Sequence, residues 1–195
     1  MILIMLSDRK GIKLIARGVI LSGCAIMIFW QATTIEAAGP KGADAQLDQE
    51  ISAPSKQSPV HLYFTDRHNY YLTAEQRVVN HSENPTGLAE TIVEELIKGP
   101  QKGLLKTIPV GTQLRAIYIA PDGTCYVDLS EAVTKNHPGG SKSELFTIYS
   151  MVNSLVLNVQ EIERVKILIY GKEALTLAGH IDLQLPVKAN MLLIR

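Results

Sequence analysis

The sequence of 195 residues has no excess of charge of either sign, few aromatic residues and only two cysteines. Its 19 basic and 19 acidic residues give a formal net charge of zero. A protein that binds a phosphate backbone needs a basic surplus to displace counterions, so no nucleic-acid partner is expected. Cys24 and Cys125 are too few for a disulfide framework or a structural zinc site. What remains is one folded domain of ordinary composition with an appendage.

Motifs that mark common catalytic centres are also missing. The sequence has no Gly-x-Ser-x-Gly elbow, no His-Glu-x-x-His pair and no phosphate-loop glycine pattern. The five histidines lie in separate segments without the spacing of metal ligands. We therefore predict no catalytic residue, no metal and no cofactor.

The first 37 residues have the three parts of an export signal. Four basic residues come first, followed by an apolar run from Gly18 to Trp30 and by small residues around Ala37; the basic residues are Arg9, Lys10, Lys13 and Arg17. As a helix, the run covers about 20 Å of a hydrocarbon core about 30 Å thick, which is short for a permanent span. Residues 1–37 are therefore predicted to be a cleaved signal peptide, with an uncleaved N-terminal membrane anchor as the alternative.

Lipidation is a third possibility for this segment, because Leu21-Ser22-Gly23-Cys24 resembles a bacterial lipobox. The residues after Cys24 are apolar, however, where a lipoprotein begins a polar tether. We interpret Cys24 as a small apolar residue of the export signal. Cleavage near Ala37 would leave 15 of the basic and 17 of the acidic residues, a net charge of −2. Residues 38–59, with three prolines and two glycines, are predicted to be a flexible linker, and residues 60–195 the folded domain.

Alternating apolar residues predict the strands of the folded part. A strand is expected over 60–64 and a second, interrupted strand over 70–72 and 76–79. Residues 113–119 and 124–129 flank Pro121-Asp122-Gly123, which predicts a hairpin.

Helical spacing of apolar residues predicts helices over 84–98 and from Ser141 to Val159. Glu144 stands three residues after Ser141, so the second helix is expected to begin with a capping box. A strong strand is predicted over 164–170, with a weaker extended pair at 180–185 and 191–194. This order predicts an α+β fold in which two helices pack on one face of a small mixed sheet.

Several polar residues have both a structural and a functional interpretation. Glu75 and Arg77 would share a strand face as an ion pair, or Arg77 would be buried and bind loop carbonyls; both roles are structural. Gly139-Gly140-Ser141 could present amides to an anion, although a flexible entry into the helix explains the same residues. The apolar alternation around Cys125 predicts a buried, inert thiol.

Two carboxylates are candidates for acid and base chemistry. Asp128 lies on the strand face opposite Cys125 and Val127, where a carboxylate more often terminates the strand by binding local amides. Glu144 is the second candidate. A glycosidase needs two carboxylates about 5 to 10 Å apart across a cleft, so the hypothesis requires the fold to bring Asp128 and Glu144 together.

Eight short motifs recur in the order and spacing of one bacterial family, and they cover most of the chain after the predicted linker. They are Tyr63-Phe64, Leu72 with Glu75-x-Arg77, Leu96-Ile97-Lys98-Gly99-Pro100, Ile108-Pro109-x-Gly111-Thr112, Val127-Asp128-Leu129-Ser130, Gly139-Gly140-Ser141 with Glu144, Tyr149-Ser150-x-Val152-Asn153-Ser154-Leu155, and Val165-x-Ile167-Leu168-Ile169-x-Gly171. On these residues the sequence resembles the GerMN domain family of sporulation and spore germination proteins, which also occurs in exported proteins and lipoproteins. The resemblance implies a fold similar to the ring-building motifs of secretion machinery, and no enzymatic activity is known for the family. One copy of the domain is present.

These observations predict an exported, non-catalytic module of the cell envelope. It would contact the membrane through its N-terminus and bind other envelope proteins or itself, through the outer sheet face or an unpaired edge strand. The alternative is a domain that binds or hydrolyses cell-wall glycan with Asp128 and Glu144. A third possibility is a structural domain that only spaces or displays the linker.

Overall fold

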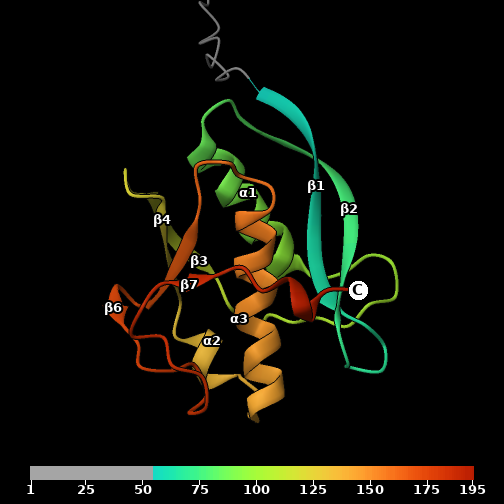
Figure 1. The fold of residues 1–195 in the computed structure, drawn as a ribbon, viewed down its shortest axis with the longest axis vertical. Coiled ribbons are helices and arrows are strands. Elements are labelled where there is room, and N and C mark those ends of the chain that lie inside the picture. Colours follow the sequence, from blue (N-terminus) through green and yellow to red (C-terminus); the bar gives the residue numbers. More distant parts are fainter. Residues whose placement is uncertain (1–54) are drawn as a thin grey trace, which may run out of the picture. The chain divides into compact units, whose positions relative to one another are not determined.

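The computed structural model describes residues 55–195, which form an α+β domain with two sheets (Figure 1). The predicted export signal, Cys24 and linker residues 38–54 lie outside this range. β1 (Ser55–Thr65) and β2 (Leu72–Ser82) form a two-stranded antiparallel sheet. The second sheet has the strand order β3-β4-β5-β6, and β7 also pairs with β5; its strands are β3 (Leu114–Ile119), β4 (Thr124–Leu129), β5 (Arg164–Ile169), β6 (Lys172–Glu173) and β7 (Val187–Lys188).

Helices α1 (Pro85–Lys98) and α3 (Ser141–Val156) pack against both sheets and against each other. The short helices α2 (Ala132–Lys135) and η1 (Met191–Leu193) lie in the connections. α1 begins where the Asn84 side chain accepts a hydrogen bond of 2.6 Å from the Gly87 amide, with Pro85 as the first helical residue. Its buried face carries Ala89, Ile92, Val93 and Leu96, which join the core.

A polar stripe on α3 binds the edge of β1 that a third strand would otherwise occupy. The Tyr63 amide donates to Ser154 Oγ at 3.0 Å, and Ser150 Oγ donates to the Tyr63 carbonyl at 2.5 Å. One helical turn further on, the His61 amide donates to Asn158 Oδ1 at 2.9 Å. Both serines are fully buried, so these hydrogen bonds satisfy backbone groups that water cannot reach.

The described domain has a main core and a smaller apolar cluster of Tyr63, Leu72 and Phe146, and it contains no buried side-chain nitrogen or oxygen without a hydrogen-bond partner. Its largest fully buried side chains come from both sheets and both long helices; they include Phe64, Leu72, Ile92, Leu96, Leu129, Ile148, Met151, Leu155 and Ile167. Within residues 55–195, no helix has the length and apolar character needed to cross a membrane.

The predicted α+β class, both long helices and the β3-β4 hairpin are confirmed, but the strands form two sheets rather than the single sheet predicted. Three strand predictions are wrong in their limits. β1 begins at Ser55, five residues earlier than predicted and inside the predicted linker, because residues 55–59 pair with the end of β2. β2 is continuous from Leu72 to Ser82 rather than interrupted. The predicted extended pair at the C-terminus is replaced by β7 and η1.

The predicted capping box at the start of α3 is also wrong. The N-cap residue is Gly140, with a φ of 85°, and no side chain caps the helix. Ser141 is the first helical residue, and the Glu144 side chain points away from the helix N-terminus toward the loop after β6. The left-handed conformation of Gly140 explains why a glycine precedes the helix.

Candidate functional site

Glu75 and Arg77 form the centre of a buried ionic network that joins β2 to the end of α1. Arg77 donates to Glu75 Oε1 at 2.5 Å, to Glu95 Oε2 at 2.7 Å and to the Gly99 carbonyl at 2.6 Å. The pKa of Glu75 lies below its ordinary value. Burial alone would raise this pKa, but the hydrogen bonds from Arg77 and from the Lys102 and Gln101 amides stabilise the charged carboxylate and lower the pKa by more. Both structural roles predicted for Arg77 are confirmed.

Glu144 is fully buried and holds the loop between β6 and β7. Its Oε1 accepts from the amides of Leu177 and Ala178 at 2.8 and 2.9 Å, and its Oε2 accepts from the amide and the Nδ1 of His180. Burial raises the pKa of Glu144, and the backbone donors lower it by more, so the pKa lies below its ordinary value. A carboxylate kept ionised by four donors is a loop anchor, with no free oxygen position for acid or base catalysis.

Asp128 holds the turn between β5 and β6. Its Oδ1 accepts from the Gly171 amide at 2.7 Å, and its Oδ2 accepts from Arg115 Nε at 3.0 Å. Tyr170 and Gly171 have φ values of 53° and 73°, as the two central residues of a type I′ turn require. A non-glycine residue in this conformation is strained, and Asp128 fixes the turn that places it there.

The two predicted carboxylates therefore have separate structural partners, and no residue contacts both. The predicted burial of Cys125 is confirmed, and this burial raises the pKa of its thiol to about 12, which disfavours the reactive thiolate. No three His, Cys, Asp or Glu side chains within residues 55–195 are placed to hold a metal ion. The hypothesis of a catalytic Asp128 and Glu144 pair has no support in these contacts.

Exposed tyrosines gather on the outer face of the larger sheet. Because Cys125 and Val127 point into the core, Tyr126 and Asp128 point to the opposite face. Tyr118 lies directly across from Tyr126 on β3, with the two ring centroids 6.4 Å apart. The side chains of Tyr118 and Tyr126 are therefore neighbours on the outer surface of this sheet.

The same surface continues past Asp128 to Arg115 and Tyr170. The Arg115 guanidinium lies 3.9 Å from the centroid of the Tyr170 ring, a cation–π contact, while it binds Asp128. Tyr118 and Tyr170 are 59% and 57% exposed. We call Tyr118, Tyr126, Tyr170 and Arg115 the tyrosine face. On its β5 side the sheet is covered, since Lys166 binds the carbonyls of Leu183 and Gln184.

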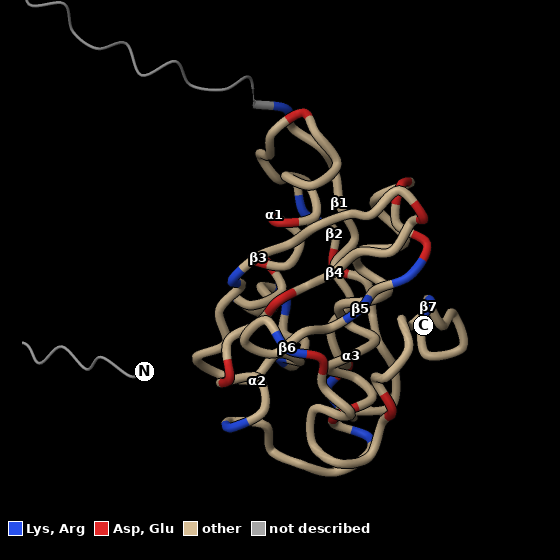
Figure 2. The backbone as a smooth tube through the Cα atoms, turned by 90° about the vertical axis from the view of Figure 1, so that its left-hand side faces the viewer, with Lys and Arg blue, Asp and Glu red and all other residues tan. Residues whose placement is uncertain are grey.

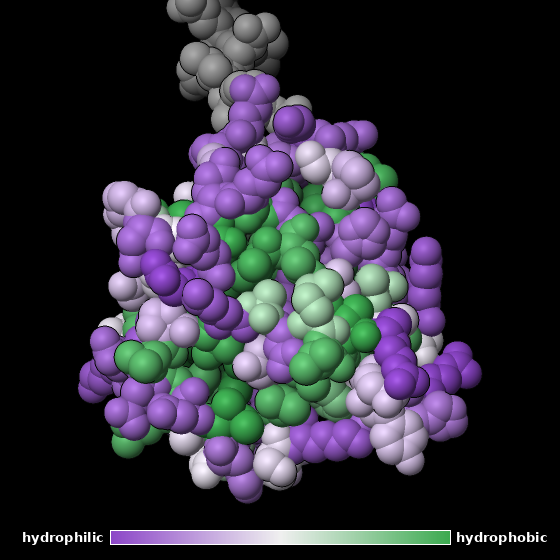
Figure 3. Space-filling view, in the orientation of Figure 1, coloured by the Kyte–Doolittle hydropathy of each residue, from purple (hydrophilic) through white to green (hydrophobic). Residues whose placement is uncertain are grey.

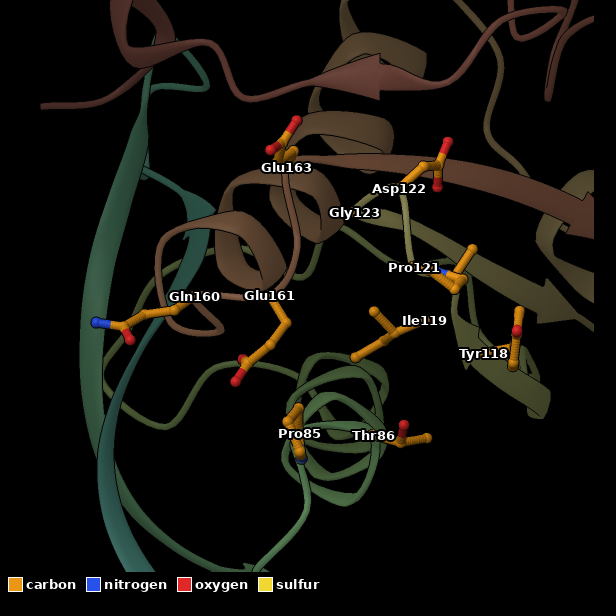
Figure 4. A pocket seen from close by; sticks show the side chains of 11 residues that line it. Pro85, Thr86, Tyr118, Ile119, Pro121, Asp122, Gly123, Gln160, Glu161 and Glu163 are labelled. Carbon is orange, nitrogen blue, oxygen red and sulfur yellow. The ribbon is translucent and has the colours of Figure 1, made fainter.

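A cleft of about 670 Å³ begins at Tyr118 and runs between the β3-β4 turn, the N-terminus of α1 and the connection from α3 to β5 (Figure 4). Three of its lining residues are acidic, yet their carboxylates do not converge. Glu161 points toward Pro85 at the start of α1, where the positive end of the helix dipole favours a carboxylate, and Asp122 and Glu163 point away from it (Figure 4). The cleft extends the tyrosine face, but its carboxylates do not form a catalytic pair.

Other surfaces of the domain differ in character. Lysine, arginine, aspartate and glutamate are interspersed along the backbone of the described domain (Figure 2). Apolar side chains gather on the face that carries α3 and the C-terminal segment (Figure 3). The exposed apolar residues of the C-terminal segment include Leu185 at 77%, Met191 at 58% and Leu192 at 88%. Tyrosine and arginine contribute far more than leucine to the energetic centres of interfaces, so the tyrosine face is the stronger candidate.

These features define a small α+β domain in which the buried charges hold the fold together and an aromatic sheet face is left exposed. The sequence model of the family Germane, described as sporulation and spore germination, matches residues 61–175. The chain belongs to this family. No curated protein matches the sequence.

Two solved structures from Bacillus subtilis are similar. The first GerMN domain of the sporulation protein GerM has a TM-score of 0.57 at 22% identity, covering 68% of this chain and 98% of that one. The tandem GerMN domains of GerM give a TM-score of 0.56 at 21% identity over 69% of this chain. The chain spans about half the length of the tandem protein, 46%. At this identity the likeness shows the fold.

Proposed function

We propose that this chain is an exported, non-catalytic module of the cell envelope that binds another protein through the tyrosine face. The observation that carries the proposal is the exposure of Tyr118 and Tyr126 side by side on β3 and β4, with Arg115 and Tyr170 in contact on the same face beyond Asp128. These are the residue types that contribute most binding energy at protein interfaces. The type I′ turn supports the same interpretation, because a strained tyrosine at the position after β5 places an exposed ring beside Arg115.

The non-catalytic part of the proposal is supported by how the domain uses its candidate acids. Asp128 and Glu144 both accept backbone hydrogen bonds that fix loops, and Arg115 occupies the second oxygen of Asp128. The description of the family names two processes, sporulation and germination, and no reaction. A role in assembling an envelope complex fits these observations better than hydrolysis of cell-wall glycan does.

Export is tested by the intact mass of the protein isolated from cells that make it naturally. We expect a mass that begins near Ala38, because the apolar run from Gly18 to Trp30 is shorter than a membrane span. The full-length mass would show that residues 1–37 remain as an anchor. A mass that begins at Cys24 with a diacylglycerol attached would show lipidation and overturn the cleavage prediction.

Binding through the tyrosine face is tested by placing a photoreactive amino acid at Tyr118 and, in a separate variant, at Tyr126. We expect both positions to cross-link to the same exported protein in cells, and Glu90 on the exposed side of α1 to give no such product. Against that purified protein, the Tyr118→Ser and Tyr170→Asn variants should each bind about 30-fold more weakly, which corresponds to the loss of one interface anchor of about 2 kcal/mol.

The Tyr170→Asn variant separates binding from folding. Asparagine before glycine is the preferred pair for a type I′ turn, so thermal stability should stay the same or rise. Unchanged affinity of both variants would contradict the proposal. Retention of the wild-type chain on purified cell-wall glycan, lost in Tyr118→Ser, would instead favour the glycan-binding alternative.

A further inference from the structure

Within residues 55–195, the outer edge of β2 has backbone groups without hydrogen-bond partners along most of its length. The Leu72 carbonyl accepts from the Arg195 amide, while Tyr63 on β1 directs its amide away from β2 to Ser154. In an antiparallel pair, successive residues direct their backbone groups alternately toward and away from the partner strand. These two contacts show that the even-numbered residues of β2 direct their N–H and C=O groups outward, away from β1. The described part of the chain places no strand beside β2 beyond Leu72 (Figure 1).

β2 lacks the features that usually protect such an edge from pairing. Four side chains of β2 are exposed after Leu72, and none of them is charged or a proline. They are Ala74, Gln76, Val78 and Asn80. The strand pairs with β1 over eleven residues without a bulge. β3, the edge strand of the larger sheet, is different, because it has six residues, a register shift between Leu114 and Ala116, and the exposed Arg115.

Charged side chains on the inner face of β2 are no obstacle to an added strand. Glu75 and Arg77 already have partners in α1 and the loop that follows it, so covering the edge would leave neither charge unpaired. A groove of about 630 Å³ runs between this edge and α1, lined among others by Thr91, Glu94 and Lys98. An added strand would lie over a groove wall that carries both signs of charge.

We propose that β2 pairs with β2 of a second copy of this chain, antiparallel and about a two-fold axis at Val78. In this register Val78 meets Val78 of the second copy, and Gln76 meets Asn80 on each side of the axis. The edge is complementary to itself, since a β-branched pair lies at the centre and uncharged amides flank it. The groove beside this edge carries Glu94 and Lys98, so each copy offers both signs of charge to the other. The result is a four-stranded sheet, β1-β2-β2-β1, that does not use the tyrosine face.

Disulfide trapping of the full chain tests this pairing. The purified protein, in detergent and with Cys24 replaced by serine, carries one cysteine at Val78 and is treated with a mild oxidant; Cys125 is buried. The matched control places the cysteine at Leu175, which is 69% exposed where Val78 is 70% exposed. We expect about tenfold more cross-linked dimer for Val78→Cys, because directly opposed Cα atoms about 5.5 Å apart are within disulfide reach.

A second measurement tests the edge without a cross-link. The Val78→Lys variant should sediment as a monomer at protein concentrations where the wild-type chain and Leu175→Lys sediment as dimers, since two lysines would meet at the axis. Equal trapping at both cysteine positions, or a wild-type chain that stays monomeric at every concentration, would overturn the proposal. Neither measurement depends on a partner of the tyrosine face, so binding there can fail or succeed independently.

Discussion

Replacing Arg77 with methionine is expected to lower the free energy of unfolding by about 4 kcal/mol, a large fraction of the stability of a single domain. Methionine preserves much of the side-chain volume but removes every donor. Glu75, whose side chain is 1% exposed, then keeps its charge without a cation, and the Gly99 carbonyl loses the Arg77 donor. The Arg77 guanidinium also lies 5.5 Å from the Phe64 ring centroid, a contact that methionine does not replace in kind. Urea unfolding followed by circular dichroism measures the loss.

A second variant separates the missing charge from the missing packing. Glu75→Gln together with Arg77→Met removes both charges and keeps a side-chain oxygen for the Gln101 and Lys102 amides. This double variant should be more stable than Arg77→Met alone, because an unpaired buried charge costs more than an absent pair. Arg115→Met serves as the control, since that side chain is 39% exposed and its ion pair should contribute less than about 1 kcal/mol. A loss for Arg77→Met no larger than for Arg115→Met would contradict the expectation.

The same network explains why the sequence predicted β2 poorly. Periodicity identifies a strand by apolar residues at every second position, and here two of those positions are Glu75 and Arg77. The alternation of buried and exposed residues is regular from Ala74 to His81, but two of the buried residues, Glu75 and Arg77, are charged and have partners more than 20 positions away. A local pattern cannot show that a charge will be neutralised by a distant segment.

α1 and β4 were predictable because their signals are local. Asn84 and Pro85 mark the start of α1, and the apolar spacing through Leu96 marks its buried face. The loop anchored by Glu144 was not predictable in this way. Glu144 stands at the position where a capping box would place it. Its side chain instead accepts hydrogen bonds from a loop more than 30 residues later in the chain, a contact that no local pattern indicates.

The tyrosine face shows a similar division between local and distant signals. The β3-β4 hairpin pattern places Tyr118 across from Tyr126, so the sequence contains that half of the surface. Tyr170 joins it through the parallel pairing of β4 with β5 and through the turn that Asp128 holds. Asp128 was predicted to be a possible acid or, more often, a residue that binds local amides at the strand end. Its amide partner is instead the distant Gly171, through which it fixes the turn that carries Tyr170.

Glu144→Gln is expected to lower the free energy of unfolding by about 3 kcal/mol, because charged hydrogen bonds are replaced by neutral ones and an amide NH₂ meets backbone donors. The loss should be concentrated in the loop between β6 and β7. Amides of residues 177–180 should exchange with deuterium faster in the variant, while those of β4 and β5 change less. Glu173→Gln is the matched control, since that side chain is 76% exposed and its contact with Lys166 should contribute less than about 1 kcal/mol.

The pH dependence of stability gives an independent check on the charge of Glu144. Its pKa is lowered in the folded protein, so the folded carboxylate stays ionised at pH values where the unfolded one takes up a proton. Its contribution is therefore complete above the unfolded pKa of about 4.3 and is lost as the pH falls through the lower folded value. His137 and His180 face the same carboxylate, and burial lowers the pKa of His137, so the two proteins are compared below pH 5 in chains that both keep these histidines. Over that acidic range the wild-type chain should lose stability more steeply than Glu144→Gln. Parallel curves for the two proteins would show that the folded pKa of Glu144 is not lowered, and that the loop is held by hydrogen bonds that do not need its charge.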